Sequence, residues 1–402
     1  MLRLFRIHTV PPEAEEEGST WLQLFFDLVY VVILVELGGR LGSDLTLGGT
    51  IQFVFLFIPI WWSWVQFVNY GSRFPIDDIG QRILTVLYMA AMLLMAFEIH
   101  AVTGVTARAF VLAYAFSKLI LALMYARVTI QFPKYRARSS RLAVTFVLIS
   151  LLWIGIALVD PTNFWLWGPV VILGIVVPPF VSGREEQNEK AYPPIKYHFL
   201  KHRFGELTII VLGEFFIKLV TSSSGRNLES INLYIGFCLL AISVSLWWLY
   251  FDHLEHTSLT TAGSRKRLWF YSHYPFLAAI TAYGVVGTQV FSTAAGQPLD
   301  DPKRLLLTTA LATALLAFGA IEWASGEREE TLARRPQTWI FIAGAASLLA
   351  LGIWGGALNA GIQVTIVASV FVLQVSLDIY KRLRHSDPRG AQGASLGANA
   401  HT

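Results

Sequence analysis

The sequence predicts an all-α, polytopic bundle of about twelve transmembrane helices. The 402-residue chain is 54% hydrophobic and only 14% charged, with a mean hydropathy of +0.54. Its apolar residues form long runs separated by short charged connections, as in a membrane bundle. This composition excludes a soluble protein of this length. The net charge of +4 does not by itself indicate an acidic partner, because basic residues of membrane proteins first reflect topology.

The apolar runs of about 18 residues or more give the spans in order. The first follows residues 1–19, a segment that lacks the apolar core of a signal peptide and is predicted to be cytoplasmic. A linker at 183–202 separates a first half, 20–182, from a second half, 203–382, and the Gly/Ala-rich tail 383–402 is predicted to be disordered. The twelve spans lie near 20–40, 49–70, 81–102, 105–127, 141–159, 163–182, 203–222, 230–251, 267–292, 304–324, 337–356 and 359–380.

Loop charge predicts the orientation. Clusters of arginine and lysine fall on alternate connections, whereas the intervening connections are short or acidic. Under the positive-inside rule, both termini are cytoplasmic, which requires an even number of spans.

The two halves show a repeated pattern. Phe25-Phe26-Asp27-Leu28 and Phe204-Gly205-Glu206-Leu207 superpose at an offset of about 179 residues, and each opens an apolar helix with a second acid, Glu36 or Glu214. Six spans per half would make the halves parallel repeats, an arrangement common in transporters.

Four ionisable residues lie deep in predicted spans: Asp27, Lys118, Glu214 and His273. Asp27 is roughly 10 Å from the start of the first span and Lys118 roughly 13 Å from the cytoplasmic end of the fourth, at 1.5 Å per residue. Charges at this depth face the bundle interior and pair. Either Lys118 holds Asp27 or Glu214 in a structural pair, or the groups line a polar pathway.

The seventh span carries a further acid, Glu206, eight residues before Glu214, so that both can face one cavity. Lys218 offers Glu214 another partner on the same helix. Asp77, Asp78, Arg203 and Asp252 lie at predicted cytoplasmic span ends and would form the mouth of a pathway.

His198, His202 and Glu206 fall at i, i+4 and i+8 on one helical stripe. Imidazole and carboxylate ligands suit a divalent ion such as Zn²⁺, so these residues are weak candidates for a metal site, with solvated side chains as the alternative. No nucleophile elbow, phosphate loop or haem motif is present, so the sequence gives no positive indication of an enzyme and we expect no cofactor.

Several motifs resemble the bacterial low temperature requirement protein A family. They are Leu24-Phe25-Phe26-Asp27-Leu28-Val29, Arg73-Phe74-Pro75-Ile76-Asp77-Asp78, His198-Phe199-Leu200-Lys201-His202-Arg203-Phe204-Gly205 with Ile209 to Glu214, and Trp247-Trp248-Leu249-Tyr250-Phe251-Asp252. Four positions depart from the usual pattern: Gln23 for Glu, Pro75 for Asp, His202 for Glu and Phe215 for Ser. The resemblance implies a multipass protein of the bacterial inner membrane, linked to growth in the cold.

We therefore expect a proton-coupled transporter or channel for an ion or small solute that uses no cofactor. Asp27 and Glu214 would be its ion or proton sites, with Lys118 and His273 as their partners. The alternative is a membrane sensor or membrane-integrated enzyme for a lipid or apolar ligand, and a purely structural role is a third reading. The expected partners are the lipid bilayer and an ion or small molecule, without nucleic acid; a homodimer is compatible with the sequence.

Overall fold

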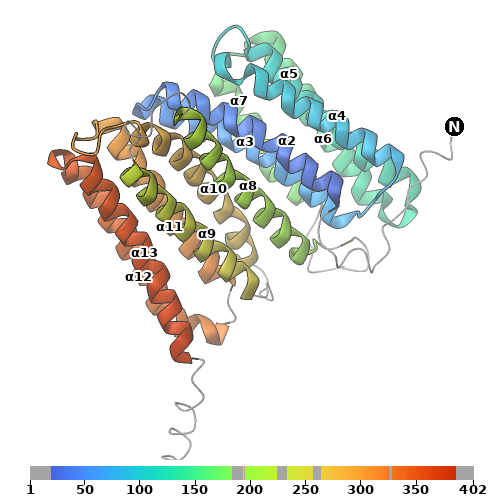
Figure 1. The fold of residues 1–402 in the computed structure, drawn as a ribbon. Helices are drawn as coiled ribbons and strands as arrows, with labels where there is room; N and C mark the ends of the chain where they lie inside the picture. Colours follow the sequence, from blue (N-terminus) through green and yellow to red (C-terminus); the bar gives the residue numbers. More distant parts are fainter. Residues whose placement is uncertain are drawn as a thin grey trace, which may run out of the picture. The chain divides into compact units, whose positions relative to one another are not determined.

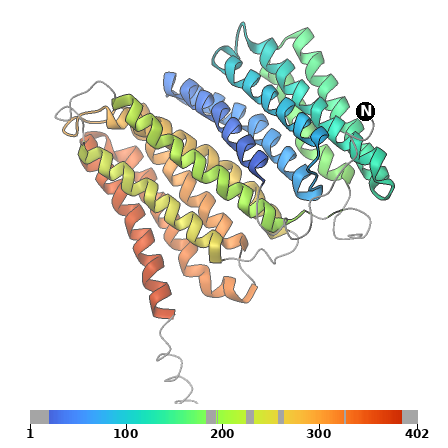
Figure 2. The ribbon, with the colours of Figure 1, turned by 45° about the vertical axis from the view of Figure 1, so that its right-hand side comes forward.

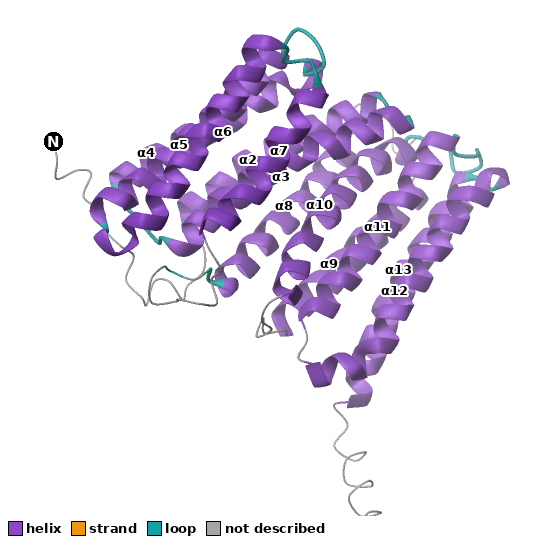
Figure 3. Cartoon of the chain, turned by 180° about the vertical axis from the view of Figure 1, so that it is seen from behind, coloured by secondary structure: helices purple, strands orange, loops and turns teal. Residues whose placement is uncertain are grey.

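A computed structural model describes residues 20–182, 193, 195–223, 233–256, 264–325 and 328–385. Within these ranges the chain forms twelve long helices and no strand, with one isolated bridge between Pro298 and Asn359 (Figure 3). The prediction of an all-α bundle is confirmed, and each predicted span corresponds to one helix. The predicted N-terminal segment 1–19 and nearly all of the predicted tail lie outside the described residues.

The first compact unit comprises residues up to Ile217 together with Ile280–Val285. Within it, α5 packs against α4 and α6, α2 packs against α3 and α4, and α6 packs against α7 (Figure 1). Its elements are α2 (Trp21–Ser43), α3 (Leu47–Arg73), α4 (Ile79–Glu98), η2 (Ile99–Ala101), α5 (Ala107–Gln131), η3 (Pro133–Tyr135), α6 (Arg136–Val159), α7 (Phe164–Ser182) and most of α8 (Tyr197–Ser223).

The second compact unit comprises Lys218–Ala279 and Val286 onward. In this unit α12 packs against α11 and α13, and α9 packs against α13 although most of the unit separates them in sequence (Figure 2). Its elements are α9 (Leu233–His256), most of α10 (Ser264–Phe291), α11 (Asp301–Ser325), α12 (Arg328–Trp354), η6 (Gly355–Ala357) and α13 (Ala360–His385).

The units divide the chain differently from the predicted halves. Most of α8 groups with the first six helices, and so does the α10 segment Ile280–Val285. Within this first unit, the ring of Phe215 on α8 lies 5.1 Å from that of Tyr283. Of the predicted linker, residues 183–192 and 194 lie outside the described ranges, and its last residues already belong to α8, which begins at Tyr197.

Eleven of the twelve described helices are long and apolar enough to cross a membrane. Such helices expose apolar side chains. On α6, the exposed residues include Val144, Leu148, Leu151 and Leu158. A continuous apolar face of this kind is stable against lipid rather than water. Helix α8 is the exception, since charged residues are spread along it from Lys201 to Lys218.

Polar caps fix the starts of three of the helices that contribute to the candidate site. Thr20 and Gln23 form a capping box at the start of α2, and Thr46 caps α3. The Asp78 carboxylate accepts a hydrogen bond from the Gln81 backbone N–H at 2.8 Å and so caps α4. Each cap satisfies an amide that the helix itself leaves without a partner.

Candidate functional site

A fully buried ion pair joins α2 to α8. The Oδ1 atom of Asp27 accepts hydrogen bonds from the Arg203 guanidinium at 2.6 Å and from the Trp64 indole N–H at 2.7 Å. Asp27 is 0% exposed and Arg203 1%. Both charges are therefore shielded from water, and each depends on the other because an isolated charge is costly in such a place.

Arg203 also contacts both of the acids that the predicted repeat would make equivalent, Asp27 and Glu206. Its Nη2 bonds Asp27, and its Nη1 lies 3.6 Å from Glu206 one turn along α8. The neighbouring Phe204 ring packs 5.0 Å from that of Trp64, which holds this part of α8 against α3. Glu214 is half-buried, two turns further along the same helix.

Lys118 occupies a second buried polar cluster, on α5. Its Nζ donates to Gln66 Oε1 at 2.7 Å and to Ser63 Oγ at 3.0 Å, and it lies 4.3 Å from the centre of the Tyr114 ring. Ser63 Oγ is in turn 2.9 Å from the Tyr88 hydroxyl and 3.5 Å from Ser117 Oγ. All the hydrogen-bonding partners of Lys118 are neutral.

The predicted pairing of Lys118 with Asp27 or Glu214 is therefore wrong. Asp27 takes Arg203 as its cation, whereas Lys118 is held by the amide and hydroxyl of α3. The reason is geometric: Ser63 and Gln66 are three residues apart and share one face of α3, toward α5, whereas Trp64 lies on another face and reaches Asp27. One helix thus separates the two charges.

At the helix ends predicted to be cytoplasmic, Asp77 and Asp78 have different roles. The carboxylate of Asp77 is paired with the Arg82 guanidinium at 2.8 and 2.9 Å and is 43% exposed. This pairing holds the pKa of Asp77 below its usual value. Asp78 is buried, and in addition to capping α4 it accepts from Arg127 Nη2 on α5 at 2.7 and 2.9 Å. Asp78 is therefore a structural residue that joins two helices.

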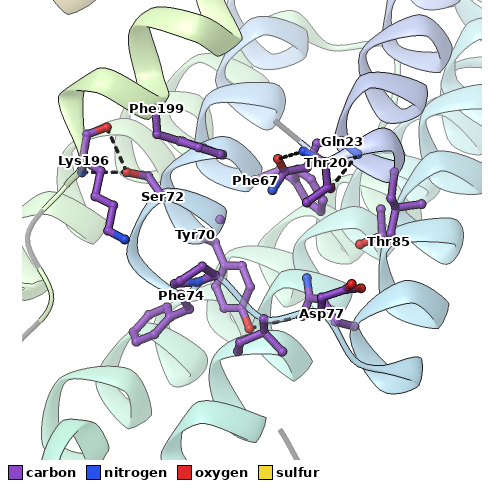
Figure 4. A pocket seen from close by; sticks show the side chains of 15 residues that line it. Thr20, Gln23, Phe67, Tyr70, Ser72, Phe74, Asp77, Thr85, Lys196 and Phe199 are labelled. Carbon is purple, nitrogen blue, oxygen red and sulfur yellow. Dashed lines mark hydrogen bonds between the residues drawn. The ribbon is translucent and has the colours of Figure 1, made fainter. Parts of the chain in front are cut away.

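A small pocket of about 70 Å³ lies among these ends and contains Asp77 in its wall. Gln23 of α2, Phe67 and Tyr70 of α3, Thr85 of α4 and Phe199 of α8 also line it. Figure 4 shows Tyr70 and Phe74 between Lys196 on one side and Asp77 on the other. The pocket combines aromatic walls with groups able to bind a polar molecule.

The pocket lies one helical turn from both buried polar clusters. On α2, Gln23 precedes Asp27 by four residues, and on α4, Thr85 precedes Tyr88 by three, so each step is about 5 Å along a helix. Between the two levels lies an aromatic layer, in which the Phe26 and Phe67 rings stack at 4.0 Å and Phe67 lies 5.0 Å from Tyr88. Of these three rings, Phe67 also lines the pocket.

His273 and Asp252, the other predicted site residues, belong to the second unit. His273 on α10 is fully buried, with Nδ1 2.7 Å from the backbone oxygen of Trp269 and Nε2 3.1 Å from the Tyr250 hydroxyl. These neutral partners hold one tautomer in place. Asp252 is half-buried on α9, two residues after Tyr250.

The histidine stripe of α8 brings two of its three members together. The Nε2 atoms of His198 and His202 are 3.3 Å apart, but Glu206 lies by Arg203 instead. Across the described parts of the chain, no group of three histidine, cysteine or acidic side chains has the geometry of a metal site. The geometry therefore does not support the predicted metal candidates.

The sequence analysis did not identify the residues that hydrogen-bond the buried charges, which are Trp64, Ser63 and Gln66. A signal for two of them is visible, because Ser63 and Gln66 place polar groups at i and i+3 on an otherwise apolar run. For Trp64 there was none, since tryptophan in a span is equally suited to packing.

Comparison with known proteins bears on the whole chain. The model of the family described as bacterial low temperature requirement A protein (LtrA) matches residues 18–375. An uncharacterized protein of Rhizobium meliloti (strain 1021) is 25% identical over 303 residues, which are 67% of this chain and 69% of that protein. The family match confirms the resemblance predicted from the motifs, and its range contains Asp27, Lys118 and Arg203.

Proposed function

This chain belongs to the bacterial low temperature requirement A family of multi-pass membrane proteins, and from that premise we propose that it is a proton-coupled transporter or channel for an ion or small solute. It would act in the bacterial inner membrane, with both termini in the cytoplasm. The observation that carries the proposal is the buried Asp27–Arg203 pair, one helical turn beyond a pocket. Ionisable groups inside membrane spans are rare and costly, and they mark ion pathways and proton relays.

The pair suits proton coupling for a specific reason. When Asp27 binds a proton, its attraction to Arg203 is lost, and the guanidinium keeps only the weaker contact with Glu206 at 3.6 Å. One proton thus changes the energy that holds α2 to α8. A coupled transporter needs such a proton-dependent energy difference to shift between its two conformations. Glu214, further along α8, is proposed as a second site on the same pathway.

The test is flux in proteoliposomes that contain the purified protein and the pH dye pyranine. An inward proton gradient is applied with K⁺, with Na⁺ or without either ion. Wild type should collapse the gradient faster than empty liposomes, whereas Asp27→Asn should not.

The matched control is Glu36→Gln, which removes an acid from the same helix. Glu36 is partly exposed and pairs with His100 at 2.5 Å, away from the buried pair. If Asp27→Asn carries protons at the wild-type rate, or if Glu36→Gln loses flux equally, the proposal is wrong.

The aromatic lining of the pocket favours a second candidate, a sensor for an apolar or lipid ligand. Phe67, Tyr70, Phe74 and Phe199 contribute aromatic rings to its wall. In that case, a short-chain phosphatidylglycerol should raise the thermal stability of the protein in detergent, and Phe199→Ala should abolish this effect. Flux with no such stabilisation would favour transport.

A further inference from the structure

The pocket that has Asp77 in its wall lies where three helices begin. Helices α2, α4 and α8 start there, and their first turns contribute the lining residues Gln23, Gln81 and Phe199. Among the helices that line the pocket, α3 alone ends there, at Arg73. The free backbone N–H groups and the dipole of a helix make its N-terminus positive, so three such ends against one negative end favour an anion.

Two buried side chains of the wall carry hydrogen-bond donors that the protein leaves unused. Thr85 is 2% exposed and Gln81 8%, and both line the pocket. The Oε1 atom of Gln81 accepts from the Tyr70 hydroxyl at 3.4 Å, so its amide N–H groups remain. Among the described residues, neither these groups nor the Thr85 hydroxyl has a hydrogen-bond partner. Since buried polar groups are almost always satisfied, we expect an acceptor inside the pocket.

The charges of the wall also suit an anion. Lys196 brings an ammonium to the side opposite Asp77 (Figure 4). Of the described lining residues Asp77 is the only acid, and the Arg82 guanidinium binds both of its oxygens, at 2.8 and 2.9 Å. Gln23 adds a further amide donor, because its Oε1 already accepts from the Thr20 backbone N–H at 3.0 Å. An anion therefore meets a cation and neutral donors, while the one lining carboxylate is already paired.

The size and the apolar part of the pocket limit the anion to a small organic one. The volume of about 70 Å³ holds roughly five to seven water-sized groups, at about 10–15 Å³ each. Phe67 and Phe199 add aromatic rings to the wall, and an inorganic ion would leave these rings without an apolar partner. A carboxylate with a total of roughly three or four carbon atoms fits both the volume and the rings.

We propose that this pocket binds a short-chain monocarboxylate of the size of propionate or butyrate. Its carboxylate lies between Gln81 and Thr85, which are four residues apart and so present their donors on one face of α4. Its apolar tail lies against Phe67 and Phe199, and Lys196 supplies the positive charge on the opposite side.

The inference rests on the proposed function and names the class of solute that is transported. Gln23 of the pocket wall precedes Asp27 by four residues, which is about one helical turn along α2. The bound anion is therefore next to the proposed proton site. Transport of one monocarboxylate with one proton moves no net charge, which is the simplest way to couple this anion to a proton gradient.

The test is binding of radiolabelled propionate to the purified full-length protein in nanodiscs, measured by scintillation proximity. Wild type should bind propionate saturably, and unlabelled butyrate should displace it. Propionamide and propylammonium have a similar size without the negative charge and should not displace it. Inorganic phosphate has the charge without the apolar tail and should compete at least about tenfold more weakly than butyrate.

Thr85→Val removes one donor at nearly constant shape and should weaken propionate binding by about tenfold or more, as expected for a hydrogen bond to a charged group. Lys196→Gln removes the positive charge and should also weaken it. Thr145→Val is the matched control, because Thr145 is a buried threonine of α6 whose hydroxyl donates to the Arg141 backbone oxygen at 2.8 Å. It does not line the pocket and should bind propionate as wild type does.

Three results would overturn the inference: no saturable binding of propionate, displacement by propylammonium or phosphate as effective as that by butyrate, or wild-type affinity in both Thr85→Val and Lys196→Gln. The two proposals fail separately. Asp27-dependent proton flux without propionate binding sinks the carboxylate site alone. Propionate binding that Thr85→Val weakens, without Asp27-dependent flux in any gradient, sinks the transport proposal alone.

Discussion

Removing Arg203 should destabilise the protein far more than removing an exposed arginine. In Arg203→Met, the Asp27 carboxylate stays fully buried with only the Trp64 N–H as its partner. Breaking a buried ion pair on one side costs about 3–5 kcal/mol. Arg82→Met is the matched control, because its ion pair with Asp77 is exposed and such pairs contribute about 1 kcal/mol or less.

A double variant separates the charge from the packing. Asp27→Asn keeps an oxygen for the Trp64 indole but removes the negative charge, so Asp27→Asn/Arg203→Met should recover more than half of the loss. Stability is measured as the midpoint of SDS-induced unfolding in mixed micelles, followed by circular dichroism. The reasoning is refuted if Arg203→Met loses no more than Arg82→Met, or if the double variant is as unstable as Arg203→Met.

Two further outcomes are expected from the exposed groups. The hydrogen bond from Arg82 lowers the pKa of Asp77 in the folded protein. The ionised carboxylate therefore stabilises the folded state fully above the pKa of an unfolded aspartate, about 4. This stabilisation is lost as the pH falls through the folded-state pKa. The difference in melting temperature between wild type and Asp77→Asn should accordingly shrink from pH 6 to pH 3, and a constant difference would contradict this. Zn²⁺ at micromolar concentration should not raise the melting temperature, since only His198 and His202 meet; a saturable rise that His202→Ala removes would show that a metal site exists.

The sequence was sufficient for the helices because their signal is local. A run of some twenty apolar residues must hydrogen-bond its own backbone in a membrane, so each run becomes one helix wherever it packs. The burial of Asp27 and Lys118 follows by the same reasoning, because a charge in a span is driven toward the protein interior. The four sequence motifs together, of which the one around Arg203 is the most specific, were likewise sufficient to identify the family.

The sequence could not show how these charges pair, because the partners are far apart in the chain, as Asp27 and Arg203 are. Depth along a span can be counted from the sequence, but direction around the bundle cannot. The count placed Lys118 near the depth of Asp27 and Arg203 at a span end, so Lys118 rather than Arg203 was an expected partner of Asp27. The tertiary structure decided between them, because α3 presents Ser63 and Gln66 toward α5 while its Trp64 reaches Asp27 beside α8. The sequence by itself determined that buried charges exist in this protein and on which helices. Only the packing of α2, α3, α5 and α8 determined that Asp27 binds an arginine and that Lys118 is held by neutral groups.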